Sequence, residues 1–370
     1  MSAGDASATG FHALHEIVAT ARTRLSDGVW GYLVGGAETE TTLARNRAAL
    51  DSLAFRPRVL RDVSAIDTTS TLLGHRVRLP VFVAPVGQLD HFDPGAAATV
   101  AEAAASFGVL QMVSSGSPPK VEEVAAAAGP DRLLYQLYVS GDADSVRQRI
   151  ERIEAAGCVG FCLTVDVAKY SRRERDIANR WGIRWQAGGF AGGEHLAALS
   201  WDDVARVRDQ CTLPLIVKGI ATVEDAVLAV EHGVDVVYVS NHGGRQLDHG
   251  LGSMTVLPDI VDAVHGRATV VVDGSINRGT DVVKALALGA DAVGIGRLAC
   301  YGLASAGAPG VVRVLELLED EIHRALGLLG VTCWDELGRS QVVPCDPAPG
   351  LRPGALSAFP LLDRRVTGDG

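Results

Sequence analysis

The sequence Val236-Val237-Tyr238-Val239-Ser240-Asn241-His242-Gly243-Gly244-Arg245-Gln246-Leu247-Asp248 joins a short apolar run directly to a polar cluster. The apolar run is typical of a strand that is buried on both faces. Such a strand presents the polar residues that follow it at one end of a fold, and two glycines allow a sharp turn there. His242 can transfer a proton near neutral pH, and Arg245 can bind a carboxylate through two hydrogen bonds. The alternative interpretation is that His242 is a loop histidine with satisfied hydrogen bonds and that Arg245 is a surface cation, neither of them part of a site.

The same layout recurs along the chain from Pro80 onward and favours a catalytic interpretation. Apolar strands alternate with polar or Gly-rich loops and Ala-rich helices. The predicted strands cover 81–85, 109–113, 133–139, 159–165, 215–217, 234–239, 269–272 and 292–295. This pattern predicts an α/β fold, a (β/α)8 TIM barrel, with a doubly wound sheet as the alternative.

The remaining segments extend this single domain at both ends. We predict a helical or cap segment over 1–79, with helices from 11 to 51, and the barrel over 80–342. The apolar spacing predicts a C-terminal helix over 310–329. Residues 343–370 are rich in Pro and Gly and show little periodicity, so we predict a poorly ordered tail.

Polar and small residues follow each predicted strand, on the face where barrel enzymes place their chemistry. In chain order they are Pro85-Val86-Gly87, Ser114, Gln136 with Tyr138, Thr164 with Asp166, Lys218, Ser240 to Arg245, Asp273-Gly274-Ser275 and Gly296-Arg297. The last two loops also contain Arg278 and several glycines. Backbone donors and arginines at this pair of loops favour a phosphate site.

Composition narrows the class of protein. The net charge is −10 and no Lys/Arg-rich block occurs, which argues against a nucleic-acid surface. No apolar run reaches the ~18 residues that span a bilayer, and the first ten residues do not resemble a signal peptide. The six cysteines are scattered without metal-ligand or disulfide spacing, so we predict no metal and a reduced, cytoplasmic enzyme.

The chain resembles the family of FMN-dependent 2-hydroxy acid oxidases and dehydrogenases, which includes glycolate and lactate oxidases and mandelate dehydrogenase. The most specific segment is Ser240 to Asp248, quoted above. The others are Leu163-Thr164-Val165-Asp166, Arg172 to Asp176, Val217-Lys218-Gly219, and Gly279 to Val282 through Gly294 to Arg297. The resemblance is collinear from about Val29 to about Gly330.

The resemblance implies a role for each matching residue. His242 would be the catalytic base, with Asp166 behind it to favour the imidazolium. Arg245 and Arg173 would hold the substrate carboxylate, and Tyr32 and Tyr138 would hydrogen-bond to it or to the 2-hydroxyl. The residues expected to contact FMN are Ala84, Pro85, Val86, Gly87, Ser114, Gln136, Thr164, Lys218, Ser240, Asp273, Gly274, Ser275, Arg278, Gly296 and Arg297.

Four departures from the family pattern shape the expected binding of substrate and cofactor and the expected electron acceptor. Gly116 stands where many relatives have an aromatic residue in the substrate pocket. The stretch 180–200, where the family has a mobile lid, is short and Gly-rich. Asn277 replaces a usual cation of the phosphate loop and would loosen FMN. Gly87 stands where many oxidases have alanine. In having glycine there, the chain resembles some of the dehydrogenases.

Taken together, these features predict oxidation of an (S)-2-hydroxy acid with a bulky side chain to the 2-oxo acid, with O2 as acceptor giving H2O2. His242 would take either the hydroxyl proton or the Cα proton. A dehydrogenase that passes electrons to a quinone or another acceptor, and an FMN-dependent isomerase-type barrel, are the alternatives. The resemblance also implies a homotetramer or homo-octamer.

Overall fold

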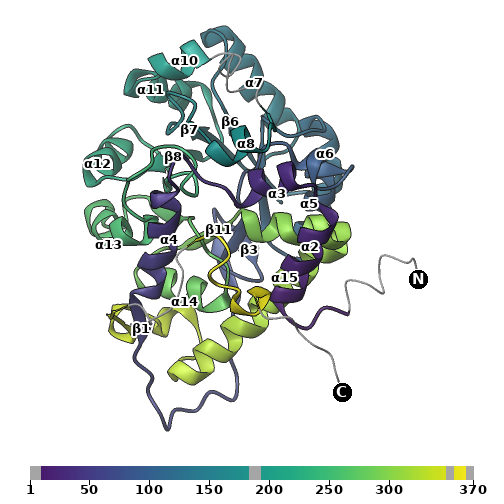
Figure 1. Ribbon diagram of the computed structural model, residues 1–370. Coiled ribbons are helices and arrows are strands. Elements are labelled where there is room, and N and C mark those ends of the chain that lie inside the picture. Colours follow the sequence, from purple (N-terminus) through teal and green to yellow (C-terminus); the bar gives the residue numbers. More distant parts are fainter. Residues whose placement is uncertain (1–9, 183–192, 347–353, 364–370) are drawn as a thin grey trace.

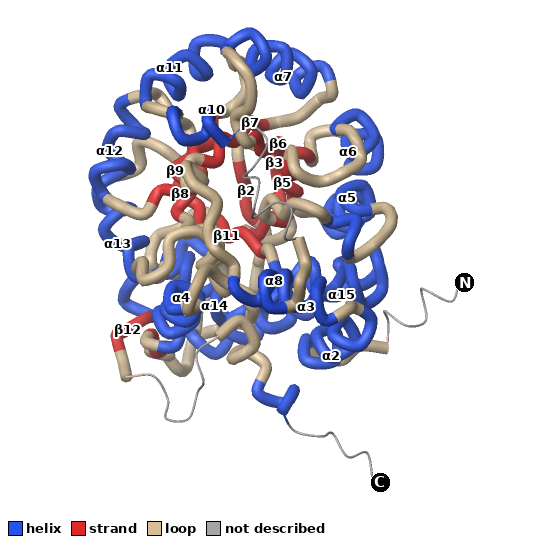
Figure 2. The backbone as a smooth tube through the Cα atoms, turned by 45° about the horizontal axis from the view of Figure 1, so that its top comes forward, coloured by secondary structure: helices blue, strands red, loops and turns tan. Residues whose placement is uncertain are grey.

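The computed structural model describes residues 10–182, 193–346 and 354–363 and shows a closed barrel of parallel strands surrounded by helices (Figures 1 and 2). Around the barrel the strand order is β4-β5-β6-β7-β8-β9-β10-β11, with β11 pairing back to β4. The strands are β4 (Val81–Val83), β5 (Leu110–Ser114), β6 (Leu133–Leu137), β7 (Gly160–Thr164), β8 (Leu215–Ile220), β9 (Val236–Val239), β10 (Thr269–Val272) and β11 (Ala292–Ile295). The predicted (β/α)8 barrel is confirmed.

The helices that follow the strands form the outer layer (Figure 2). They are α5 (Ala96–Phe107), α6 (Val121–Ala128), α7 (Ala143–Ala155), α8 (Glu174–Ala178), α10 (Gly193–Ala198), α11 (Trp201–Gln210), α12 (Val223–Glu231), α13 (Ser253–Val264), α14 (Gly279–Ala287) and α15 (Arg297–Leu329). The backbone of α15 breaks at Ala306 and Gly307, just before Pro309, so that it consists of two helical pieces. The second piece corresponds to the predicted helix over 310–329.

α15 is also, by length and composition, apolar enough to cross a membrane, with a mean hydropathy of 1.4. The sequence did not predict this, because charged and polar residues interrupt its apolar runs. Of the apolar window in α15, 67% is buried within the fold, which is typical of a core helix.

The barrel interior is filled by apolar side chains, among them Phe82, Met112 and Tyr238. The hairpin of β2 (Ser70–Leu72) and β3 (His75–Val77) adds Leu72 and Val77 to the same cluster. The hairpin therefore closes the end of the barrel where the strands begin. The opposite end, where the strands finish, is left for the site.

The N-terminal segment packs on the outside of the barrel through α2 (Leu14–Arg24), α3 (Asp27–Val34) and α4 (Thr41–Asp51). α2 lies along α15, α4 lies on α13, and α3 reaches α8 (Figure 1). Ser26 caps the N-terminus of α3 by accepting a hydrogen bond from the Val29 amide. α3 carries Tyr32, so this segment brings a predicted site residue to the barrel mouth.

The C-terminal segment differs in part from the poorly ordered tail that the composition predicts. β12 (Val342–Pro344) pairs antiparallel with β1 (Leu53–Phe55). Residues 354–363, which end in the 3-10 helix η4 (Pro360–Asp363), pack against α2, and Phe359 is 1% exposed. The buried side chain of Phe359 fixes this part of the tail to the fold. The high Pro and Gly content of the tail gave no indication of this contact. Residues 347–353 and 364–370 of the predicted tail lie outside the described residues.

Candidate active site

A cavity of about 670 Å³ opens at the end of the barrel where the strands finish. Most of the predicted site residues line it. They are Tyr32, Ala84, Pro85, Val86, Gly87, Gly116, Tyr138, Arg173, Lys218, His242, Arg245, Asp273, Gly274, Ser275, Gly296 and Arg297. Residues that are far apart in the sequence therefore meet in one place, as the strand-end pattern predicted.

His242 follows β9 in a turn of left-handed backbone, with φ values of 58° at His242, 64° at Gly243 and 74° at Gly244. Its Nδ1 lies 2.9 Å from Asp166 Oδ1, and its Nε2 lies 3.4 Å from the Tyr138 hydroxyl. The Asp166 contact fixes the ring orientation and directs Nε2 to the cavity. Gly244 is required because a Cβ there would lie 2.5 Å from the Leu43 amide nitrogen of α4.

The electrostatics of this pair make His242 a neutral base. Burial lowers the pKa of His242, and the Asp166 carboxylate raises it only in part, so the pKa stays below its ordinary value of 6.5. The expected effect of Asp166 is present but is outweighed by burial. For Asp166, burial acts to raise the pKa, but His242 and Lys218 outweigh it and hold the pKa below its usual value. Asp166 is thus an anion that can stabilise an imidazolium once His242 accepts a proton.

Two arginines lie close to this dyad. Arg245 donates from Nη1 to the carbonyls of Tyr32 (2.6 Å) and Gly35 (2.8 Å), and its guanidinium lies 4.6 Å from the centre of the Tyr32 ring. Burial, and then the neighbouring Arg173, lower the pKa of Arg245 to about 10, so it remains a cation at neutral pH. Arg173 is 7% exposed and lies over the Tyr170 ring at 4.8 Å. Two adjacent cations at the cavity wall are suited to binding a carboxylate.

A buried polar layer lies beneath the cavity. Lys218 is 3% exposed, and its Nζ lies 5.5 Å from the centre of the Tyr238 ring. Asp273 accepts hydrogen bonds from the Tyr238 hydroxyl (2.9 Å) and from Ser240 Oγ (2.7 Å). The sequence did not mark Tyr238 as a site residue because it stands within an apolar strand. Its hydroxyl nevertheless fixes Asp273 at the cavity floor.

The remaining predicted cofactor residues test whether a flavin fits here. Ser114 Oγ donates to Gln136 Oε1 at 2.7 Å, which orients that amide. Within the described part of the chain, Gln136 Nε2, Thr164 Oγ1 and Ser275 Oγ are buried and have no hydrogen-bond partner. Buried polar atoms are rarely left in this state, so they point to a polar ligand. The polar edge of an isoalloxazine and a ribityl chain supply suitable partners, and the residues present therefore fit FMN.

The two arginines predicted to bind phosphate have other partners. Arg278 is not among the described residues that line the cavity, and its guanidinium pairs with Glu321 and donates to the Ala358 carbonyl. The Glu321 carboxylate on α15 holds the Arg278 side chain, so the structure does not bring Arg278 together with the other predicted residues, and its phosphate contact stays a prediction. Arg297 lines the cavity, but its guanidinium donates to the carbonyls of Leu33 (2.9 Å), Gly243 (3.0 Å) and Gly35 (2.8 Å). Arg297 thus ties α3 to the histidine loop.

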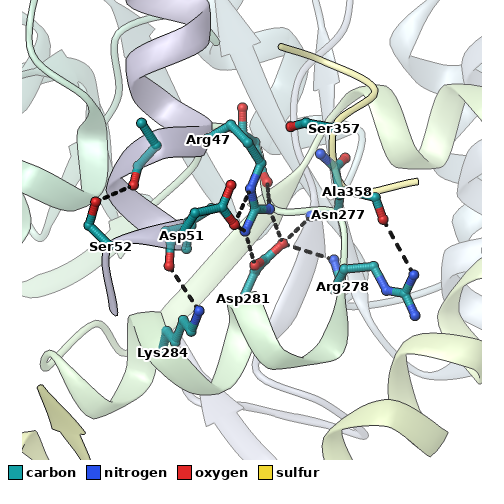
Figure 3. A network of polar contacts seen from close by, with 12 residues as sticks. Arg47, Asp51, Ser52, Asn277, Arg278, Asp281, Lys284, Ser357 and Ala358 are labelled. Atoms are coloured by element: carbon teal, nitrogen blue, oxygen red, sulfur yellow. Dashed lines mark hydrogen bonds and ion pairs between the residues drawn. The ribbon is translucent and has the colours of Figure 1, made fainter. Parts of the chain in front are cut away.

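The loop after β10 is held by a buried ion pair that the sequence did not reveal (Figure 3). Asp281 Oδ2 accepts hydrogen bonds from Arg47 Nη1 (2.8 Å) and from the amides of Asn277 and Arg278 (3.0 Å each). Arg47 also pairs with Asp51 at 2.7 Å. α4 of the N-terminal segment therefore fixes the loop that contributes Ser275 and Asn277 to the cavity.

An aromatic group at the cavity wall was also missed. Tyr32 lies between Phe92 and Trp181. The centre of its ring is 6.4 Å from that of Phe92 and 4.4 Å from that of Trp181. Phe92, Tyr170 and His195 line the cavity, although neither their spacing nor their neighbours in the sequence distinguish them from core residues. The predicted Gly-rich lid falls mainly on residues 183–192, which lie outside the described residues.

The described residues contain no group of three or more His, Cys, Asp or Glu side chains that could hold a metal ion.

Comparison with known proteins agrees with this geometry. Residues 21–344 match the family described as FMN-dependent dehydrogenase. Glycolate oxidase from Spinacia oleracea is 39% identical over 360 residues, covering 92% of this chain and 97% of that protein. L-lactate oxidase from Nostoc sp. is 40% identical over 359 residues, covering 88% and 96%. A crystal structure of mandelate oxidase superposes with a TM-score of 0.82 at 39% identity, covering 88% of this chain and 96% of that one. The chain belongs to the FMN-dependent dehydrogenase family, and its cofactor is FMN.

Proposed function

We propose that the protein oxidises an (S)-2-hydroxy acid with a bulky side chain to the 2-oxo acid and uses O2 as electron acceptor. FMN supplies the two-electron chemistry. The substrate loses two electrons and two protons, and O2 takes them up as H2O2. The oxidases of glycolate, lactate and mandelate among the relatives support the reaction class.

The chain's own residues can be assigned to this reaction. Arg245 and Arg173 bind the substrate carboxylate, which leaves the 2-hydroxyl and Cα in reach of the dyad. His242, neutral before the reaction, accepts a proton at Nε2 while Nδ1 stays on Asp166, 2.9 Å away. The resulting imidazolium is paired with a carboxylate in a buried setting, where such a pair is strongly attractive.

The observation that carries the substrate class is Gly116. It lines the cavity beside Tyr138, and a Cβ built on it would lie 4.0 Å from Tyr138 Cε2. The cavity is therefore open on the side where an aromatic side chain would otherwise stand. Tyr170 and Phe92 supply apolar wall to pack against a bulky substituent.

The test is the ratio of kcat/KM values for H2O2 formation across (S)-2-hydroxy acids, from glycolate and lactate to mandelate and longer aliphatic acids. We expect the bulky acids to exceed glycolate by about 10² or more, because each extra apolar group in such a pocket contributes about 1–3 kcal/mol. A preference for glycolate or lactate over every larger acid would contradict the proposal.

A dehydrogenase is the second candidate, and Gly87 favours it. Gly87 lines the cavity without a side chain, and a Cβ there would meet the Gly116 carbonyl, with the oxygen at 3.5 Å and the carbon at 3.9 Å. The same reduced enzyme distinguishes the two candidates. Rapid reoxidation by air supports the oxidase, and reoxidation by a quinone or dye at a much higher rate than by air supports the dehydrogenase. The cytoplasmic location and the homotetramer or homo-octamer stay predictions.

A further inference from the structure

The C-terminal segment 354–363 lies beyond residue 344, where the match to the family ends. Its Ala355 lines the same cavity as Ser275 and Asn277 and is 8% exposed. The barrel domain that defines the family therefore does not form the whole wall of this cavity. A part of the chain outside that domain completes it.

The segment is anchored next to the phosphate loop. Phe359 is 1% exposed, and its ring makes edge contacts with His15 of α2 (5.7 Å) and Tyr301 of α15 (6.2 Å). The Ala358 carbonyl accepts a hydrogen bond from Arg278 Nη1 at 3.4 Å (Figure 3). Arg278 directly follows Asn277 in the loop, so the segment and the loop are joined at this end of the cavity.

The phosphate end needs such support because most donors of the two predicted arginines are already engaged. Asn277 is uncharged, and Arg278 pairs with Glu321. Each of the three guanidinium nitrogens of Arg297 already donates to one backbone carbonyl, which leaves two of its five N–H groups for a phosphate. Retention of a phosphate by direct ion pairing is therefore weakened. Exclusion of water and closure by protein atoms can act in its place by slowing release.

We propose that the segment 354–363, held by Phe359, forms part of the FMN site and retains the cofactor by closing the phosphate end of the cavity. FMN release then requires the Phe359 side chain to leave its site between α2 and α15. This inference concerns the cofactor and does not depend on which hydroxy acid is oxidised.

The test compares Phe359→Ala with Leu361→Ala in the full chain. Leu361 belongs to the same segment but is 44% exposed, so its truncation controls for a general change of the segment. FMN release is followed by the gain of flavin fluorescence after dilution, and folding by thermal unfolding monitored by circular dichroism. We expect release from Phe359→Ala to be about tenfold faster, which corresponds to about 1.4 kcal/mol, and release from Leu361→Ala to be unchanged.

Equal release rates for Phe359→Ala and the unchanged protein, with an intact fold, would overturn the proposal. If Phe359→Ala does not fold, a chain that ends at residue 346 provides the second measurement, since it keeps every residue of the family match. That chain should bind FMN with a raised dissociation constant. Retention of FMN as tight as in the full chain would equally overturn the proposal.

Discussion

Replacement of Gly116 by phenylalanine should convert the enzyme from a preference for bulky acids to a preference for small ones. The backbone permits the change. A Cβ at Gly116 would lie 3.6 Å from Ser114 Oγ, 3.9 Å from Gly87 Cα and 4.0 Å from Tyr138 Cε2, which are ordinary contacts. The introduced ring must therefore extend into the cavity rather than strain the fold.

The magnitude follows from what the ring displaces. A fully buried phenyl group contributes about 1.5–3 kcal/mol of apolar burial, and forcing two rings into one space costs about 1–3 kcal/mol more. A loss of about 3 kcal/mol corresponds to about 150-fold in kcat/KM for mandelate. Lactate does not need this space, so its kcat/KM should change by less than about threefold.

The assay is H2O2 formation under steady state for both acids, with Gly116→Ala as the matched control. Alanine keeps the cavity open and should leave the ratio of the two substrates near its original value. If Gly116→Phe binds FMN normally and still oxidises mandelate and lactate in the original ratio, Gly116 does not face the substrate side chain and the reasoning fails.

Two further predictions concern charge. The kcat/KM should be constant at neutral pH and fall as the pH drops through a pKa below 6.5, because protonation removes the neutral His242 base and burial holds the pKa of His242 down. Asp166→Asn should move this fall in kcat/KM to still lower pH, since the Asp166 carboxylate raises the pKa of His242. A shift to higher pH would contradict the assignment. Asp281→Asn should reduce the free energy of unfolding in urea by about 3 kcal/mol, because it removes the charged partner of Arg47, which is 4% exposed. Asp320→Asn, which breaks the exposed pair with Arg324, should change the free energy of unfolding by less than about 0.5 kcal/mol. Equal effects of the two changes would refute the role of the buried pair.

The barrel was predictable because it follows from local patterns, whereas the pairing of Asp166 with His242 was implied by the family resemblance. Buried parallel strands read as continuous apolar runs, and the residues that follow them must meet at one end of a closed barrel. This pattern placed His242, Asp166 and Lys218 at one end of the barrel, where the structure has them. The apolar spacing also predicted the helix over 310–329, which is the second piece of α15.

The sequence could not reveal the other partners of the predicted residues. Arg278 and Arg297 have the charge that a phosphate needs. The Glu321 carboxylate binds Arg278, and three backbone carbonyls accept hydrogen bonds from Arg297, which still lines the cavity. These partners come from distant segments, so no spacing in the sequence reveals them. The packed C-terminal segment was missed for the same reason, because the site of Phe359 is formed by α2 and α15.

The most direct test of the central claim is anaerobic mixing of the FMN-loaded enzyme with (S)-mandelate in a stopped-flow instrument, with His242→Ala as comparison. We predict rapid loss of the visible flavin absorbance in the unchanged enzyme, a loss slowed by about 10² or more in His242→Ala, and return of the colour on admission of air. If a fully loaded flavin stays oxidised with mandelate and with every other (S)-2-hydroxy acid in the series, or if His242→Ala is reduced at the original rate, the proposed reaction at this site is contradicted.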